Sequence, residues 1–152
     1  MIPVTGLGFA LFLACCVVAL ASGPAFAQGA PATLYAAHRG GSLLWAENSL
    51  LAFRNAVALG ADYLEFDVHL SKEGEPVVIH DPTLERTTTG SGPVRGKTLA
   101  ELRALRLRDR NAQVADETIP TLDEVVRVAA AGNRRMLLEI KVDERGQRYP
   151  GI

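Results

Sequence analysis

The chain has 152 residues, of which 22% are charged, and a formal net charge of −1. A balance this close to zero excludes the strongly basic composition that attracts nucleic acids or anionic membranes. The charged residues are unevenly placed, because Arg39 is the first Asp, Glu, Lys or Arg in the chain. The sequence thus divides into an apolar leader and an ordinary globular portion.

The leader has the pattern of a secretory signal peptide. An apolar run from Leu7 to Ala21 is followed by Ala25 and Ala27, small residues at the two positions that signal peptidase requires. We predict a signal peptide over residues 1–27 and export to the periplasm or the extracellular space, with no stable membrane association after cleavage. The alternative is an uncleaved membrane anchor, because no Lys or Arg precedes the run and about twenty apolar residues suffice to span a bilayer.

Both cysteines of the chain, Cys15 and Cys16, lie within this apolar run and would leave with it. The mature portion would then contain no disulfide and would depend on its core for stability. Lipid attachment at either cysteine is a weaker alternative, because the apolar run continues past both. Residues 28–33 are mostly small and are predicted to form a flexible linker before a domain over 34–152.

The first predicted unit of this domain is a strand, a glycine turn and a helix in succession. The short apolar run 34–37 leads into the glycine-containing turn 38–41. Asn48 or Ser49 is placed to cap a helix whose apolar residues recur at helical spacing, and Gly60 is placed to end it. The order is typical of one repeat of an α/β fold.

Strands and helices continue to alternate along the rest of the chain. A second strand is predicted over 63–70 and a short one over 76–79, with a turn between them. Capping boxes at 98–101 and 121–124 predict two further helices, and 136–140 is predicted to be the third main strand. Because parallel strands need a crossover, which helices supply, this alternation predicts an α/β fold with a parallel sheet.

A complete (β/α)8 barrel, or TIM barrel, needs roughly 250 residues. The portion that follows the predicted leader is about half as long. Because the motif resemblance described below implies a barrel, we expect the N-terminal part of a TIM barrel, truncated before its later strands. An incomplete barrel leaves strand edges unpaired. We therefore expect this fragment alone to be inactive and poorly folded.

The most informative segment for chemistry is Glu65-Phe66-Asp67. Side chains two apart on a strand project from the same face, so Glu65 and Asp67 should lie side by side while Phe66 points the other way. Two carboxylates inside a covered sheet need a compensating charge, and hard divalent cations prefer oxygen ligands. The alternative for an isolated pair of this kind is a solvated edge strand.

Further polar residues occur where the other predicted strands end. Glu139 and Lys141 repeat the same spacing at the end of the third main strand, His38 and Arg39 follow the first strand, and His80 closes the short strand. In a parallel barrel the carboxyl ends of the strands form the active-site face. The positions of these residues therefore indicate one common site.

These motifs together resemble a known family of enzymes. A set of segments is similar, in order and in spacing, to the motifs of the glycerophosphodiester phosphodiesterase family, namely residues 37–41, 47–49, 65–68, 78–81, 86–88, 119–123 and 138–141. The chain departs from the family pattern at Ala46, where the family usually has Pro, and at Ser49, where it usually has Thr. Both departures lie at a helix start, so they should alter the turn more than the chemistry.

The resemblance implies a metal-dependent site. By this resemblance Glu65, Asp67 and Glu139 ligate a divalent cation, Mg or Ca, and His38 and His80 form the acid and base pair. A histidine suits either role, because its unperturbed pKa lies near neutral pH.

The resemblance also assigns the remaining charged residues of the site. Arg39 would hold the phosphate, and Lys141 would add positive charge near the phosphoryl oxygens. Glu47 would order the site rather than react.

The implied reaction is hydrolysis of a small-molecule glycerophosphodiester to glycerol 3-phosphate and an alcohol. The first nucleophile would be the substrate's own glycerol hydroxyl, which gives a cyclic phosphate that water then opens. Two alternatives remain open, namely a related phospholipase D-like barrel enzyme that cleaves lysophospholipids, and a non-catalytic binding module or inactive truncated product. The sequence predicts neither the oligomeric state nor the leaving alcohol.

Overall fold

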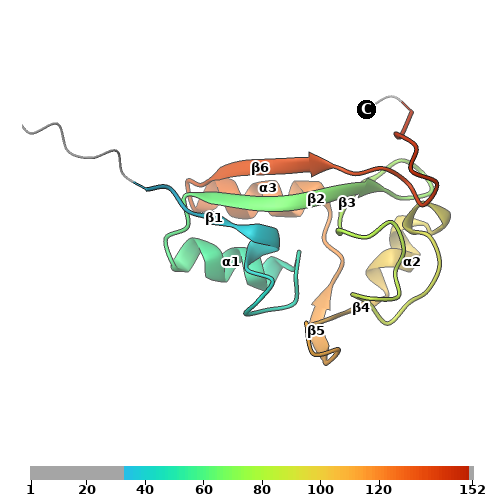
Figure 1. The fold of residues 1–152 in the computed structure, drawn as a ribbon, viewed down its shortest axis with the longest axis horizontal. Helices are drawn as coiled ribbons and strands as arrows, with labels where there is room; N and C mark the ends of the chain where they lie inside the picture. Colours follow the sequence, from blue (N-terminus) through green and yellow to red (C-terminus); the bar gives the residue numbers. More distant parts are fainter. Residues whose placement is uncertain (1–32, 151–152) are drawn as a thin grey trace, which may run out of the picture. The chain divides into compact units, whose positions relative to one another are not determined.

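The computed structural model describes residues 33–150 of the chain (Figure 1). The predicted signal peptide and nearly all of the predicted linker lie outside the described residues, so the structure does not bear on them. Within the described part, no helix is both long enough and apolar enough to cross a membrane.

The centre of the fold is strand β2 (Tyr63–Leu70), which has neighbours on both edges. Strand β6 (Arg135–Ile140) runs parallel to it along one edge. On the other edge β1 (Ala36–Ala37) pairs in parallel with the start of β2, and β3 (Pro76–Val78) pairs antiparallel with its end. The three main strands are therefore parallel, as the sequence predicts, while the turn before β3 is too short for a crossover and makes a hairpin.

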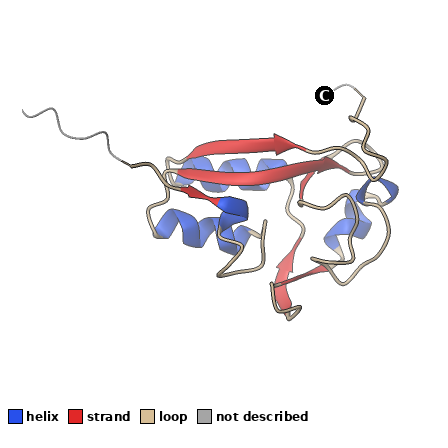
Figure 2. Cartoon of the chain, viewed as in Figure 1, coloured by secondary structure: helices blue, strands red, loops and turns tan. Residues whose placement is uncertain are grey.

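Helices α1 (Leu50–Ala58) and α3 (Leu122–Ala131) lie along the strands on one side of this sheet (Figures 1 and 2). Phe53 of α1 meets Phe66 of β2 edge to face, with ring centroids 5.9 Å apart. Val125 and Ala129 of α3 belong to the same buried cluster. This cluster fixes which face of β2 is apolar, and so which face carries its polar side chains.

Side-chain caps begin each of these helices, and a third helix follows the same rule. The Ser49 hydroxyl accepts a hydrogen bond from the Ala52 N–H at the start of α1. Thr121 and Glu124 form a capping box at the start of α3, and α2 (Leu99–Arg103) begins with another. The predicted capping residues are confirmed, with Ser49 rather than Asn48 as the cap of α1.

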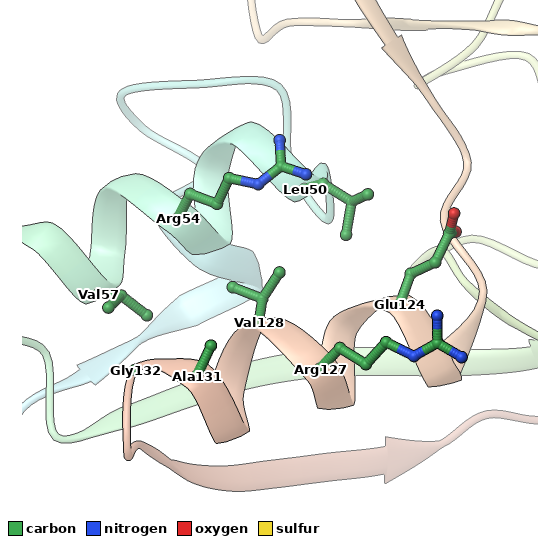
Figure 3. Close-up of a pocket in the computed structure, with 8 residues that line it drawn as sticks. All are labelled: Leu50, Arg54, Val57, Glu124, Arg127, Val128, Ala131 and Gly132. Atoms are coloured by element: carbon green, nitrogen blue, oxygen red, sulfur yellow. The ribbon is translucent and has the colours of Figure 1, made fainter.

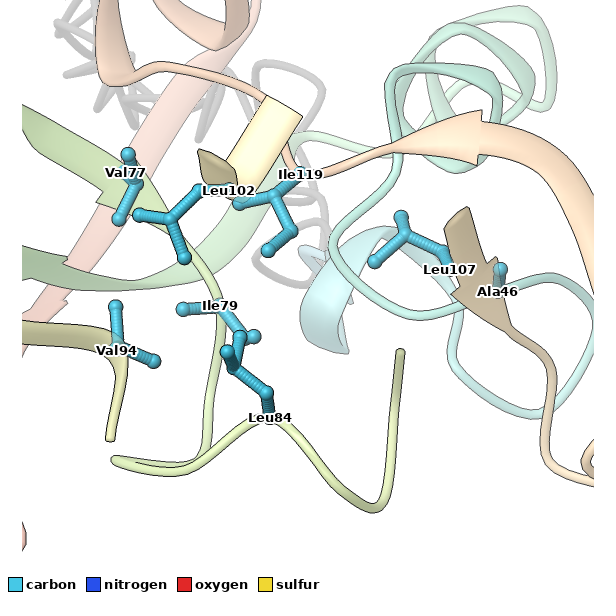
Figure 4. Close-up of a cluster of buried hydrophobic side chains, with 8 residues drawn as sticks. All are labelled: Ala46, Val77, Ile79, Leu84, Val94, Leu102, Leu107 and Ile119. Carbon is cyan, nitrogen blue, oxygen red and sulfur yellow. The ribbon is translucent and has the colours of Figure 1, made fainter. Parts of the chain in front are cut away.

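A second hydrophobic cluster packs beside the sheet under the long segment between β3 and α3 (Figure 4). It joins side chains from β3, α2, the connecting loops and β4 (Arg106–Arg108), with Leu102 and Leu107 among its buried members. Ala46, the residue that replaces the family's usual Pro, is also buried in it. Strand β4 pairs antiparallel with β5 (Val114–Thr118), a hairpin that the sequence analysis did not predict.

Candidate functional site

Three carboxylates gather on the face of the sheet opposite α1 and α3. Glu65 and Asp67 project from β2, and Glu139 is the register partner of Asp67 on β6. One oxygen from each lies within 4.8 Å of the others. Asp67 is only 1% exposed, so the solvated edge-strand interpretation is wrong, and the predicted side-by-side placement is confirmed.

Two cations border this carboxylate cluster. The Lys141 Nζ atom lies 3.1 Å from Asp67 Oδ1 and 2.8 Å from Glu139 Oε1. Burial by itself would lower the pKa of Lys141, but its hydrogen bonds to Glu139 and Asp67 raise it above the usual value. The Arg39 Nε atom lies 3.6 Å from Asp67 Oδ2. With two cations for three carboxylates, the cluster keeps an excess of negative charge.

The donor set fits a hard divalent cation. All three acidic residues offer oxygen atoms, the ligands that Mg and Ca prefer. The Asn48 amide nitrogen donates to Asp67 Oδ2 at 3.0 Å, and its buried Oδ1 has no hydrogen-bond partner among the described residues. An unpaired buried acceptor beside unbalanced carboxylates is compatible with a cation or its water at this place. Glu65, Asp67 and Glu139 could therefore hold a metal ion.

The turn after β1 brings Arg39 to this cluster. Arg39 itself has a left-handed backbone (φ 50°), and its N–H donates to Glu65 Oε2 at 2.7 Å. Gly40 follows at φ 73°, where an added Cβ would come within 2.9 Å of the Ala52 Cβ. Only glycine fits there, so the motif residue has a packing reason as well as a conformational one. The same turn leaves His38 exposed at the end of β1.

Glu47 connects Arg39 with a second arginine. Its carboxylate lies 3.2 Å from Arg39 Nη1 and accepts a bidentate pair of bonds from Arg86, at 2.8 and 2.9 Å. The Glu47 carboxylate thus holds the guanidinium groups of Arg39 and Arg86 in place and makes no contact with the three clustered carboxylates. The geometry agrees with an ordering role for Glu47.

His80 has a carboxylate partner that sequence reasoning missed. The His80 Nδ1 atom lies 2.7 Å from Asp81 Oδ1, and Asp81 also accepts bonds from Arg86 Nε and Nη2. The hydrogen bonds from Arg86 lower the pKa of Asp81 to about 2, although burial opposes this shift. Asp81 is therefore a carboxylate that holds the Nδ1 side of the ring, which leaves Nε2 as the free nitrogen. An acidic residue directly after the histidine was the available signal.

A buried histidine, His69, forms a hydrogen bond with the backbone of His80. The His69 Nε2 atom lies 3.0 Å from the His80 carbonyl oxygen, which can only accept, so Nε2 carries the proton. His69 Nδ1 is then an acceptor, and the Tyr149 hydroxyl 2.7 Å away donates to it. Burial lowers the pKa of His69 and so favours this neutral form. No local sequence pattern indicates this contact, because it joins residues far apart in the chain.

Seven of the eight predicted site residues thus form one connected network. The ion pairs run from the carboxylate cluster through Arg39, Glu47, Arg86 and Asp81 to His80. His38 lies directly before Arg39 in the turn, without a side-chain hydrogen bond among the described residues. All eight predicted residues lie in or beside this network.

A separate groove of about 490 Å³ lies between α1 and α3 (Figure 3). It is lined by Leu50 and Arg54 of α1 and by Arg127 and Val128 of α3, among others. Because these helices cover the face of the sheet opposite the carboxylates, the groove is not part of the candidate site.

Comparisons with known proteins show the family to which the chain belongs. The model of the glycerophosphoryl diester phosphodiesterase family matches residues 38–149. A glycerophosphodiester phosphodiesterase of Caldanaerobacter subterraneus is 44% identical over 121 residues, which are 79% of this chain and 49% of the relative. The chain thus spans about half the length of that relative.

Solved structures of related phosphodiesterases have the same fold over most of this chain. A putative glycerophosphoryl diester phosphodiesterase of Agrobacterium tumefaciens superposes with a TM-score of 0.71 at 31% identity, over 78% of this chain and 47% of that one. An Oleispira antarctica phosphodiesterase, solved with the product sn-glycerol-3-phosphate, gives a TM-score of 0.65 at 38% identity, over 72% and 44%. These likenesses confirm the predicted fold class, part of an α/β barrel.

Proposed function

Because the chain belongs to the glycerophosphoryl diester phosphodiesterase family, we propose that the protein hydrolyses glycerophosphodiesters to glycerol 3-phosphate and an alcohol. The observation that carries the proposal is the convergence of three carboxylates, Arg39 and the His80–Asp81 pair at one end of the parallel strands. Its Oleispira relative, which was solved with glycerol 3-phosphate as product, adds support.

The cationic side chains have a clear task in this reaction. A divalent cation held by Glu65, Asp67 and Glu139 would offset charge on the nonbridging phosphoryl oxygens. Arg39 grips two of these oxygens with its guanidinium fork, and Lys141 adds a point charge beside them. Glu47 keeps Arg39 in position while it does so.

His38 and His80 move the protons. One ring takes the proton from the attacking glycerol hydroxyl, and the other protonates the oxygen of the leaving alcohol. The cyclic phosphate that results is opened by water, with the two roles exchanged. Asp81 keeps His80 Nδ1 engaged, so Nε2 is the nitrogen that faces the substrate.

The described residues form only part of the walls of this site. The Glu139 side chain is 58% exposed, and His38 is also exposed. Catalytic groups need a geometry that is fixed to fractions of an ångström. We therefore propose that the 152-residue polypeptide alone is inactive, and that a longer polypeptide supplying the remaining strands is active.

The test is release of glycerol 3-phosphate from a panel of glycerophosphodiesters, with the chain and with such a longer polypeptide. We expect chelation to abolish activity, and Mg or Ca to restore it. Asp67→Ala should be inactive, while Asp116→Ala, at a fully exposed site outside the cluster, should behave as wild type. His38→Ala and His80→Ala should each lose roughly 100-fold or more in rate.

Two results would contradict the proposal at different levels. Activity that does not respond to chelation would remove the metal from the mechanism but keep the reaction. Failure of the longer polypeptide to release glycerol 3-phosphate from any member of the panel would remove the reaction itself.

A further inference from the structure

A cavity of about 290 Å³ adjoins the candidate site and is used by none of the proposed catalytic steps. We infer that it holds the leaving alcohol of the substrate and selects alcohols rich in acceptor oxygens, such as polyols, over cationic ones. The inference rests on the proposed function. The residues that carry it are Glu47, Arg86, Thr87, Arg108, Asp109 and Arg110.

The position of the cavity follows from the ion pairs of its inner wall. Glu47 and Arg86 line it, and they are bonded to each other at 2.8 and 2.9 Å. On the far side of this wall Glu47 contacts Arg39, and Arg86 contacts Asp81, the partner of His80. Glu47 thus lies between Arg39 and the cavity, so the alcohol of a phosphodiester held at Arg39 would extend past Glu47 to enter it.

The outer wall, at the β4–β5 hairpin, supplies hydrogen-bond donors that no carboxylate occupies. Arg108 donates to the Thr88 and Ala112 carbonyl oxygens at 2.8 and 3.2 Å, and Arg110 approaches the Leu43 carbonyl oxygen at 3.5 Å. Neither guanidinium has an ion-pair partner in the described part of the chain. Each keeps free N–H groups, and a guanidinium donates but never accepts, so a ligand here must bring acceptor oxygens.

The acidic residue of the hairpin does not cancel these charges. One oxygen of Asp109 is engaged by the N–H groups of Asn111 and Gln113, at 2.8 and 2.9 Å, and closes the hairpin turn. The lining holds three arginines, Arg86, Arg108 and Arg110, against two carboxylates, Glu47 and Asp109, so it keeps one excess positive charge.

The Thr87 hydroxyl is a second, independent indication that a ligand binds in this cavity, because it lacks a hydrogen-bond partner among the described residues. Thr87 is 3% exposed and lines the cavity. Buried hydroxyls are normally paired, because leaving one unpaired costs stability. A hydroxyl of the bound alcohol would satisfy it.

The same lining disfavours a quaternary ammonium group such as choline. Sites for such cations use aromatic rings, and the described lining contains none. A trimethylammonium group would instead meet guanidinium groups of its own charge. The cavity is therefore matched to a hydroxyl-rich alcohol such as inositol.

The experiment compares glycerophosphoinositol with glycerophosphocholine. Binding is measured by calorimetry with His80→Ala, which slows turnover roughly 100-fold or more, and kcat/KM for both esters is measured without that change. Both measurements use the longer polypeptide that supplies the remaining strands. We expect at least a fivefold preference for the inositol ester, and Arg110→Glu should abolish this preference. Thr87→Val should reduce it a few-fold without any change in charge.

Arg54→Glu, on the helix-covered side, is the matched control, since it makes the same charge change away from the cavity. It should leave the preference unchanged. Arg110→Gln repeats the test should Arg110→Glu prove unfolded by circular dichroism. Equal affinity for both esters, or a preference that survives loss of the Arg110 charge, would overturn the inference. Selective binding without release of glycerol 3-phosphate would instead refute the proposed function and leave the binding site in place.

Discussion

The ionised carboxylate of Asp81 decides how the His80 ring is presented. It bonds His80 Nδ1 at 2.7 Å and is itself held by Arg86. Asp81→Asn keeps the shape but loses the charge that fixes the ring and its tautomer. We expect kcat to fall about 10- to 100-fold with little change in KM, because an orienting group acts on the proton transfer rather than on substrate binding. Steady-state kinetics, with Asp116→Asn as control, provide the measurement.

Asp81 should also make the free energy of unfolding depend on pH in the acid range. Hydrogen bonds from Arg86 lower the pKa of Asp81 from 3.8 to about 2, so the folded state favours the ionised form. Because the pKa is lower in the folded state, ionised Asp81 stabilises the fold at pH values above its pKa in the unfolded state. This contribution is lost as the pH falls toward 2. The free energy of unfolding of the wild type should therefore drop more steeply between about pH 4 and pH 2 than that of Asp81→Asn. Urea denaturation at several pH values tests this, and parallel curves would contradict it.

Sequence reasoning found the site residues whose placement depends on local rules. The spacing of Glu65 and Asp67 fixes their common face once the strand is recognised. The contact of His69 with Tyr149 joins residues 80 positions apart, so no local pattern announces it. Arg86 likewise belongs to the site only because the chain returns to bring it to Glu47.

At the scale of helices, the capping boxes were the most reliable signals in the sequence. Thr121 and Glu124 satisfy each other's backbone N–H groups at the start of α3, and this helix packs its buried face on the sheet. The signal is contained within four residues, so tertiary contacts do not alter it. The bounds of β2 were also predicted correctly, because its alternation of apolar and polar residues extends over eight residues.

We expect Thr121→Ala to lower the free energy of unfolding by roughly 1 kcal/mol, since it leaves a helix N–H without its cap. The measurement is urea denaturation of the purified protein. Thr33→Ala, at an exposed residue outside every helix and strand, should change the stability by much less. Equal stability of both variants would show that water replaces the cap at no cost.

The β4–β5 hairpin could not be predicted because its stability comes from distant contacts. Its first strand has one apolar residue, Leu107, between two arginines, a run too short to predict a strand. The structure buries Leu107 in the second hydrophobic cluster and pairs it with Thr88. Long-range packing, not local preference, makes this element.

At the scale of the whole molecule, the order of the motifs along the chain predicted the family and the fold class. Each motif alone is weak, but together they predicted the family that the match over residues 38–149 confirms. The open strand edge expected of an incomplete barrel is also observed in the described residues. β6 has only one neighbouring strand in the described part of the chain, and its side chains are all exposed.

The apolar side of β6 leads to the last prediction. Leu138 and Ile140 are register partners of Phe66 and Val68, so they continue the buried helix-side face of the sheet. They are nevertheless 43% and 52% exposed, beside an open strand edge. Fully burying one exposed side chain of this size is worth roughly 1.5–3 kcal/mol, and about half of each is already buried, so covering both contributes roughly 1.5–3 kcal/mol per chain. Open edges also offer unpaired backbone groups to a second copy.

We therefore expect the 152-residue polypeptide to associate with itself at micromolar concentrations and to elute ahead of a monomer in size-exclusion chromatography. Replacing Leu138 and Ile140 together by Lys places charges on the apolar face and should return the protein to a monomer, with its circular dichroism spectrum retained. Leu59→Lys is the matched control, because Leu59 is 71% exposed at the end of α1, away from this edge, and its replacement should leave the association intact. A wild-type chain that remains monomeric across the concentration range would mean that solvent tolerates the exposed face of β6, and the hydrophobic argument for association would fail.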